Sequence, residues 1–262
     1  MMSTTALVLT ATLLLFPIIV SYKEKLHIIK DLLVATLRAV VQLVILGYLL
    51  HFIFDVNQTW LLLLFVLIII INASWNTISR ASPVMHHVFW ISFIAIFIGV
   101  ALPLVGIVIT GAIEFKPNEV IPIAGMLGSN GLIAINLAYQ NLDREFVKEM
   151  SQIEAKLALG ANPKLSSKGT IRESIKTAIV PTIDSVKTYG IVSIPGMMTG
   201  LIIGGVDPLE AVKFQLLVVF IHMTATIMSA LIATYLSYRQ FFNERDQLIA
   251  RHIPKDLSLI HI

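Results

Sequence analysis

Apolar residues along the chain gather in blocks long enough to cross a lipid bilayer. A spanning helix needs about 20 mostly apolar residues. Within a block the apolar residues are continuous, as from Leu61 to Ile71, and do not alternate with polar ones as in a membrane barrel. The pattern predicts an all-α integral membrane protein with about seven transmembrane helices in a single domain over residues 1–262. The blocks lie near residues 4–20, 32–54, 59–78, 89–110, 120–141, 179–203 and 210–236.

The composition agrees with lipid as the solvent. Hydrophobic residues make up 56% of the chain and charged residues 13%, whereas soluble domains average about 45–50% and about 25%. A formal net charge of +3 would allow a nucleic-acid partner, but the basic residues are distributed as in membrane proteins, so we expect none. The absence of cysteine excludes disulfides and thiolate metal sites.

Basic residues indicate which loops face the cytoplasm, because cytoplasmic loops contain an excess of Lys and Arg. They are most numerous in the long loop over residues 142–178 and in the charged tail over 239–262, whereas the intervening loops contain only Lys116 and Lys213. This distribution predicts an external N-terminus and a cytoplasmic C-terminus. No basic residue precedes the first block, so we interpret it as a retained helix, with a cleaved signal as the alternative.

The long loop has the pattern of three helices. Apolar residues recur at spacings of three and four from Leu142 to Leu157, which predicts an extension of the fifth span that ends at Gly160. Asn162 and Pro163 are typical of an N-cap and the first position of a short helix. A loop of this kind is either a plain connector or a docking element, and spacing alone leaves both open.

The end of the short loop helix is predicted from its glycine and capping residues. We expect the helix to run from Pro163 to Lys168 and to be broken by Gly169. Thr170, with Glu173 three residues later, has the form of a capping box that begins the helix leading into the sixth span.

The segment Glu154–Pro163 resembles the conserved cytoplasmic loop of ABC importer permeases, whose pattern is Glu-Ala-Ala, three residues, then Gly. In those permeases, the short helix after the glycine docks on a separate ATP-binding subunit. The match is partial, because Lys156 replaces the second alanine and Arg172-Glu173 stands where Leu-Pro is usual. The coupling residues that this resemblance implies are Glu154, Gly160, Ala161, Pro163 and Leu165.

A second resemblance covers nearly the whole chain. The sequence is similar to the FetB-like permeases, a family tied to iron export in bacteria with plant relatives linked to aluminium tolerance. It implies a multi-pass permease of the bacterial cytoplasmic (inner) membrane, with two copies forming the pathway. The strings that support it are Lys23–Leu26, Asn72–Asn76, Ile121–Met126, Pro181–Thr188 and Ile194–Met198.

The leading hypothesis is therefore the permease subunit of an ABC transporter that exports a metal cation, with iron as the first candidate. The chain has no Walker A motif. We thus expect no cofactor in this chain and no enzymatic activity, with ATP and Mg bound by the partner ATPase. The expected partners are that ATP-binding subunit, a second permease copy and membrane lipid. An ATP-independent channel or secondary carrier, and a non-transporting assembly factor, are the alternatives.

Polar groups within membrane spans are costly and usually face the bundle interior, so they are candidates for the transport path, with interhelical hydrogen bonding as the alternative. Asp184 and Lys187 are one turn apart, which favours an ion pair near the inner end of the sixth span, close to the short loop helix. A helix break at Pro195-Gly196 would free carbonyl groups. The path candidates are Asn72, Asn76, Asn130, Asp184, Lys187, Pro195 and Gly196.

Oxygen donors and thioethers are the candidate ligands for a metal cargo. Glu114 and Glu119 flank the outer end of the expected pathway, and Met197 and Met198 lie at the helix break. Solvated loop carboxylates and packing of the thioethers are the ordinary alternatives.

The topology can be tested with single cysteines, because the chain contains none. A cysteine in place of Ser166, within the loop over 142–178, is expected not to react with an impermeant thiol reagent in intact cells. Labelling before permeabilisation of the cells would contradict a cytoplasmic loop.

Overall fold

A computed structural model of the chain describes residues 4–56 and 58–249. The described residues are almost entirely helical, which confirms the predicted all-α membrane fold. Contacts within the chain divide into two units, residues 1–58 and residues 59–262. The single permease domain over 1–262 stays a prediction.

The first unit is a run of short helices followed by one long helix. It comprises α1 (Thr4–Ala11), a 3-10 turn (Thr12–Leu14), α2 (Leu15–Lys23) and α3 (Ile29–Val56). The block predicted as the first span is thus interrupted by the 3-10 turn. The most apolar stretch of α3 buries no residue within the chain.

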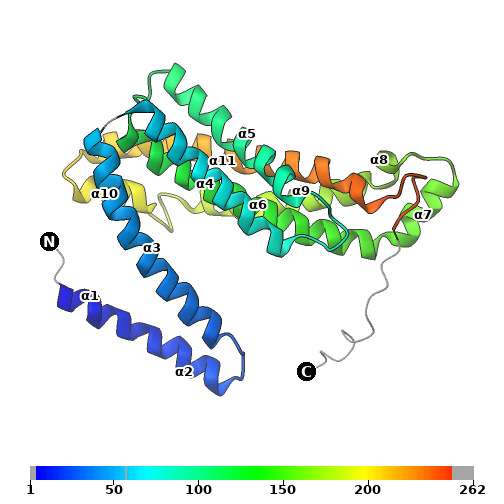
Figure 1. The fold of residues 1–262 in the computed structure, drawn as a ribbon, viewed down its shortest axis with the longest axis horizontal. Helices are drawn as coiled ribbons and strands as arrows, with labels where there is room; N and C mark the ends of the chain where they lie inside the picture. The colour runs from blue at the N-terminus through cyan, green and yellow to red at the C-terminus, as the bar shows by residue number, and fades with distance from the viewer. Residues whose placement is uncertain (1–3, 57, 250–262) are drawn as a thin grey trace. The chain divides into compact units, whose positions relative to one another are not determined.

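The second unit is a bundle of long helices with short helices at one end, as Figure 1 shows for α4, α5, α6 and α11 with α7 and α8. Its elements are α4 (Thr59–Thr77), η2 (Ile78–Arg80), α5 (Val88–Ile109), α6 (Pro117–Lys148), α7 (Met150–Ala158), α8 (Pro163–Ser166), α9 (Lys168–Thr188), α10 (Gly196–Ile203), α11 (Pro208–Ser237) and η3 (Tyr238–Phe241).

Five of the seven predicted spans are single helices of sufficient length and apolarity among the described residues: α3, α4 with η2, α5, α6, and α11 with η3. The predicted sixth span, 179–203, is not a continuous helix. α9 ends at Thr188 and α10 begins at Gly196. Gly190 between them has a φ of +82°, a conformation that a helix does not contain. The external N-terminus and cytoplasmic C-terminus stay predictions.

The helix break that was expected at Gly169 lies elsewhere. α8 ends at Ser166 and α9 already begins at Lys168, so Gly169 and Thr170 lie within the first turn of α9 and not between helices. The backbone N–H of Ile171 donates to Ser167 O (2.9 Å). Thr170 and Ile171 are both buried, and this burial outweighs the local preference for a helix break and a capping box.

Small residues hold the helices of the second unit together. α6 packs against α4, α5, α9 and α11. In lipid the hydrophobic effect does not drive helices together, so close van der Waals contact between small residues becomes decisive. Buried alanines provide this contact where α6, α9 and α11 meet: Ala134, Ala138, Ala178 and Ala230.

The closest approach surrounds Ser229 of α11. A Cβ atom on Gly99 of α5 would lie 2.1 Å from Ser229 Oγ, and a Cβ on Gly131 of α6 would lie 2.9 Å from the same atom. Ser229 Oγ donates to the carbonyl oxygen of Ala95 (3.3 Å). Three helices, α5, α6 and α11, therefore meet around the hydroxyl group of Ser229. They approach so closely that α5 and α6 each require a glycine at the point of contact.

Buried hydroxyl groups link α4, α5 and α6. Thr77 Oγ1 donates to Ser92 Oγ (2.7 Å), which lies 3.0 Å from Tyr139 Oη. All three side chains are buried. Buried polar groups without partners are expensive in a membrane, so this chain of hydrogen bonds favours one register of the three helices.

Gly99→Ala is expected to destabilise the bundle by about 1–3 kcal/mol, because the added methyl group overpacks the contact with Ser229. Gly106→Ala, on the same helix with no atom within 4 Å of the new Cβ, is the matched control. Thermal unfolding in detergent should show a lower midpoint for Gly99→Ala alone. The added change Ser229→Ala should restore part of the loss, and equal midpoints for the two single variants would contradict the contact.

Candidate functional site

The turn after α7 is built around Gly160. The N–H of Gly160 donates to Leu157 O (2.9 Å) and that of Ala161 to Lys156 O (3.0 Å), the two hydrogen bonds of a Schellman motif. Gly160 has a φ of +88°, which strains any residue with a Cβ atom. The predicted end of this helix is confirmed, and the direction in which the chain leaves α7 depends on Gly160.

Asn162 begins α8 as predicted. Its Oδ1 accepts a hydrogen bond from the N–H of Leu165 (2.8 Å), and Pro163 occupies the first turn and is buried. Ser166 is only 1% exposed, so a cysteine there would be a silent topology probe. Lys164 is exposed and is the accessible position for that experiment.

Two leucines are displayed on this turn. The exposed fractions are 88% for Leu159 and 59% for Leu165. Glu154 is exposed and Ala161 is half-buried. Large apolar side chains held outward on a rigid, capped turn are typical of an interaction site. The role of all five predicted coupling residues in docking stays a prediction.

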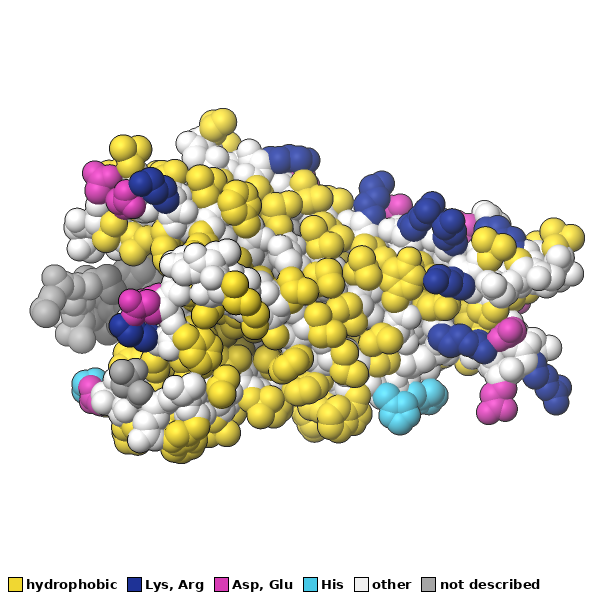
Figure 2. All heavy atoms as spheres, turned by 90° about the horizontal axis from the view of Figure 1, so that it is seen from above, with side chains coloured by type: hydrophobic (Ala, Val, Ile, Leu, Met, Phe, Trp, Pro, Cys, Tyr) yellow, Lys and Arg dark blue, Asp and Glu magenta, His cyan; other side chains and the backbone are white. Residues whose placement is uncertain are grey.

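The loop end of the second unit is strongly basic. Figure 2 shows Lys and Arg side chains gathered toward this end of the molecule. Such a surface attracts acidic groups of a protein or of lipid head groups. The exposed basic residues of the loop and of α9 are Arg144, Lys148, Lys156, Lys164, Lys168, Arg172 and Lys176.

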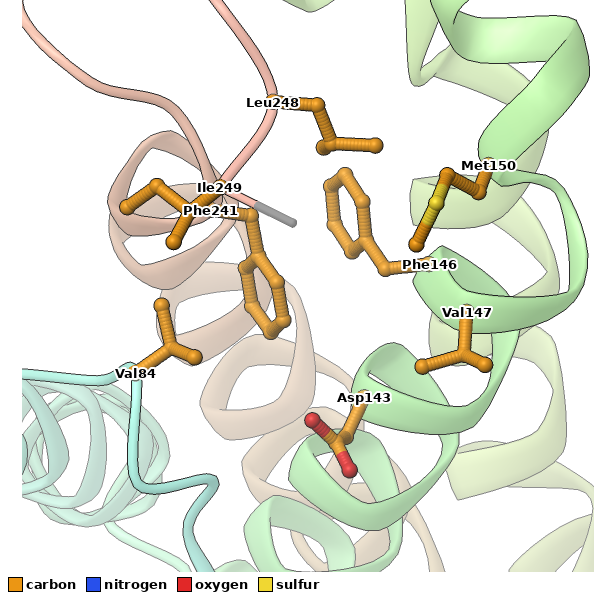
Figure 3. Close-up of a pocket in the computed structure, with 8 residues that line it drawn as sticks. All are labelled: Val84, Asp143, Phe146, Val147, Met150, Phe241, Leu248 and Ile249. Carbon is orange, nitrogen blue, oxygen red and sulfur yellow. The ribbon is translucent and has the colours of Figure 1, made fainter. Parts of the chain in front are cut away.

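An aromatic contact attaches the end of α11 to the end of α6. The ring of Phe146 stacks on that of Phe241 with centroids 4.1 Å apart, and Phe242 meets Phe146 edge-on at 5.8 Å. Figure 3 shows Phe146 between Phe241, Leu248 and Met150. Sequence reasoning missed this contact because it treated the residues after the last span as a charged tail, although two adjacent phenylalanines there signal burial.

The face of α6 that points away from its neighbours is partly polar. Ser129 and Gln140 are exposed, and Asn136 is half-buried between them. These residues lie on one side of the helix because Asn136 is about two turns from Ser129 and about one turn from Gln140. The buried Oδ1 atom of Asn136 has no hydrogen-bond partner among the described residues. Polar groups at this depth require water or another protein surface and not lipid.

Asp184 and Lys187 form the predicted ion pair, with Lys187 Nζ 3.0 Å from Asp184 Oδ1. Their expected position close to α8 is wrong. α9 returns antiparallel along α6 (Figure 1), and Asn141 Nδ2 donates to Thr177 Oγ1 (3.3 Å). Asp184 lies about 10 Å further along α9, so the pair is beside the middle of α6. The expected position is wrong because α9 is one continuous helix, and its last turns, which contain both residues, lie far from the loop.

The predicted asparagines belong to different environments. On α4, Asn76 Nδ2 donates to the carbonyl oxygen (2.7 Å) and to Oδ1 (3.0 Å) of Asn72, so these two side chains bond within one helix. Asn130 is half-buried on α6. α4 packs against α5 and α6, whereas α9 packs against α6 and α11. No described contact therefore brings Asn72 or Asn76 close to Asp184.

The predicted helix break is present. Pro195 is the N-cap of α10 (φ −60°, ψ 143°), and Gly196 is its first residue and exposed. Met197 and Met198 follow and are half-buried. The chain is thus irregular from Tyr189 to Pro195, which a membrane tolerates only where the backbone lies against protein or water.

Glu114 and Glu119 lie together at the start of α6. Glu119 Oε2 accepts a hydrogen bond from the N–H of Glu114 (2.8 Å), and the Glu114 carboxylate pairs with Lys116. The side-chain hydrogen bond from Lys116 to the Glu114 carboxylate, together with the charge of Glu114, raises the pKa of Lys116. Among the described residues, no three His, Cys, Asp or Glu side chains are close enough to hold a metal ion. Cation binding by the two glutamates and two methionines stays a prediction.

The sequence matches known proteins over nearly its whole length. Residues 4–242 match the family described as "Uncharacterised protein family (UPF0014)". The chain is 46% identical to "Probable iron export permease protein FetB" of Escherichia coli (strain K12), over 95% of this chain and 96% of the relative. It is 36% identical to "UPF0014 membrane protein YjkA" of Bacillus subtilis (strain 168), over 93% and 97%.

A plant protein is also similar. "Protein ALUMINUM SENSITIVE 3" of Arabidopsis thaliana is 30% identical over 89% of this chain and 85% of the relative. No solved structure matches the chain.

The exposed polar face of α6 can be tested by labelling. Ser129→Cys should react roughly tenfold faster with a water-soluble maleimide than Ile68→Cys in reconstituted vesicles, because only a hydrated thiol ionises readily. Ile68 is the depth-matched control: it is exposed, and a Cβ on Gly128 would lie 3.1 Å from Ile69 Cγ2. Equal rates for the two cysteines would show that the polar face is not hydrated.

Proposed function

Because the chain belongs to the UPF0014 family of membrane proteins, as its sequence resemblance predicted, we propose that it is the membrane subunit of an ABC transporter. The proposed cargo is a metal cation, with iron first, since the E. coli relative is named a probable iron export permease. A separate subunit binds ATP and Mg, and this chain is not an enzyme. The proposed location is the bacterial cytoplasmic membrane.

The observation that carries the proposal is the pair of outward leucines on a capped turn. Leu159 and Leu165 flank the Schellman motif of Gly160 and the N-cap of Asn162, so their backbone positions are rigid. Burial of a leucine side chain contributes about 1.5–3 kcal/mol. The two side chains together would therefore contribute about 3–6 kcal/mol to docking of a partner, and a plain connector has no need to display them in water.

The same geometry provides a lever. α8 is followed after a single residue, Ser167, by α9, which is about 32 Å long. α9 lies along α6 and bears the Asp184–Lys187 pair in its last turns. A displacement of α8 by an ATPase would therefore move a stiff helix whose far end lies along the middle of α6. This arrangement supports coupling of ATP binding to access of the pathway.

The path proposed for the cargo is the polar surface of α6 and α9, enclosed by a second copy of the chain. Ser129, Asn136, Gln140 and Asp184 offer oxygen atoms, the donor type that hard metal cations prefer. The charge of Lys187 partly offsets that of Asp184, which lowers the cost of placing a carboxylate at this depth. Glu114 and Glu119 would collect or release the cation at the outer end.

The coupling turn separates this proposal from an ATP-independent channel or carrier. Gly160→Val should reduce co-purification of a co-expressed ATP-binding subunit, because a β-branched residue at this φ costs about 1–3 kcal/mol and redirects the chain before α8. Leu165→Asp should reduce it as well, by removing an apolar contact.

Gly169→Val is the matched control for Gly160→Val, since Gly169 is helical, exposed and surrounded by open space. It is expected to bind the ATPase like the wild type, and membrane insertion should be equal in all variants. If no ATPase binds the wild type, or if Gly160→Val and Leu165→Asp both bind and stimulate it normally, the ABC permease proposal fails.

A further inference from the structure

The residues that follow η3 form an ordered turn. The N–H of Asn243 donates to Gln247 O (2.9 Å), and the Asn243 Oδ1 atom accepts from the N–H groups of Arg245 and Gln247 (both 2.9 Å). The N–H of Ile249 donates to Phe241 O (2.9 Å). We call residues 242–249 the C-terminal turn. Asn243 is its central residue, because this one side chain accepts hydrogen bonds from two other residues of the turn.

The C-terminal turn is fixed to the bundle at both ends. Arg239 Nη2 lies 2.6 Å from Asp246 Oδ1, which binds the tip of the turn back to η3. Phe241 and Phe242 are buried against Phe146 of α6. Leu248 and Ile249 lie beside the same aromatic rings (Figure 3). The turn is therefore held in place by contacts with α6 and not only by its own hydrogen bonds.

We call α7, α8 and the turn between them the coupling loop. A hollow of about 690 Å³ separates the C-terminal turn from the coupling loop. One side consists of residues of α7 and its terminal turn, from Glu154 to Asn162, and the other of Arg245–Leu248. Asp246 is paired with Arg239, whereas Arg245 forms no ion pair with any described residue. The exposed guanidinium of Arg245 thus adds a positive charge to the end of the second unit at which Lys156 and Lys164 are also exposed.

We propose that the C-terminal turn is the second half of the docking site for the ATP-binding subunit. This inference rests on the proposed function. The partner surface that it requires has an apolar pocket for Leu159 and Leu165 and acidic side chains facing Arg245 and the lysines. Charge complementarity of this kind steers association and determines register.

Continuity of the surface identifies the occupant. Gly160, Ala161 and Asn162 line the hollow and also lie within the segment proposed to dock, so a partner bound to this segment would border the hollow. The lining contains Glu154, Arg245, Asp246 and Gln247, which suits a protein surface and not lipid tails. Residues 250–262 directly follow the turn in the sequence. The alternative, that these residues bind in the hollow in place of the partner, is tested by the same experiment.

The experiment measures the affinity of the purified, detergent-solubilised chain for a purified candidate ATP-binding subunit, in wild type, four point variants and one truncated chain. Arg245→Glu should weaken binding roughly tenfold, because it replaces attraction to an acidic partner by repulsion. Asn243→Ala should weaken it by disrupting the turn, without changing the stability of the bundle. Arg80→Glu is the control, the same charge reversal on an exposed arginine of η2 that lies outside the basic surface of the loop and does not line the hollow.

The outcomes separate the two proposals. If the wild type does not bind, the ABC permease function fails. If the wild type binds and Leu165→Asp does not, but Arg245→Glu and Asn243→Ala both bind like wild type, the docking role of the C-terminal turn is overturned and the function stands. A chain that ends at Ile249 should bind like wild type, and a severalfold gain in affinity on this truncation would show that residues 250–262 occupy the hollow instead. Thermal unfolding in detergent verifies that each variant is folded.

Discussion

The second unit depends on the close approach of α5, α6 and α11 around the hydroxyl group of Ser229. In lipid, apolar side chains gain little by leaving their surroundings, so helices associate where backbones can come close together. Gly99 and Gly131 permit that approach, and a methyl group on Gly99 would overlap Ser229 Oγ. The alanine contact of α6, α9 and α11 extends the same principle toward the loop. This packing positions α6, and α6 positions everything that the proposed function requires.

α6 connects the two parts of the proposed mechanism. Its last turns hold the coupling loop and, through Phe146, the C-terminal turn. Its middle turns bear Ser129 and Asn136, and α9, which packs along α6, bears the Asp184–Lys187 pair. A polar face on an otherwise apolar bundle is unfavourable against lipid, which favours a second copy with enclosed water over a solitary chain. In the proposed mechanism, docking at one end and cargo passage in the middle would thus use one pair of helices, α6 and α9.

The docking surface that we infer is composite. The coupling loop provides the apolar contacts of Leu159 and Leu165, and the C-terminal turn provides Arg245 across the hollow. Because both elements are attached to the end of α6, a partner that bridges them would act on α6, α9 and α11 together. A surface built from two segments that are both attached to α6 transmits force more directly than a single flexible loop, because neither segment can move without the other.

Features that depend on a few consecutive residues were predictable from the sequence. Gly160 ends α7, Asn162 caps α8, Asp184 pairs with Lys187 and Pro195-Gly196 interrupts the helix, because the hydrogen bonds and steric limits involved are local. The continuous apolar blocks likewise determine the helical membrane class. The start of α9 at Lys168 was not predictable, because burial of Thr170 and Ile171 overrides the local capping signals. Only the tertiary structure decided that Phe241 stacks on Phe146, that Gly99 meets Ser229, and that Ser129 and Gln140 face outward. Those contacts join residues far apart in the chain, and no pattern within one helix specifies which neighbour it will meet.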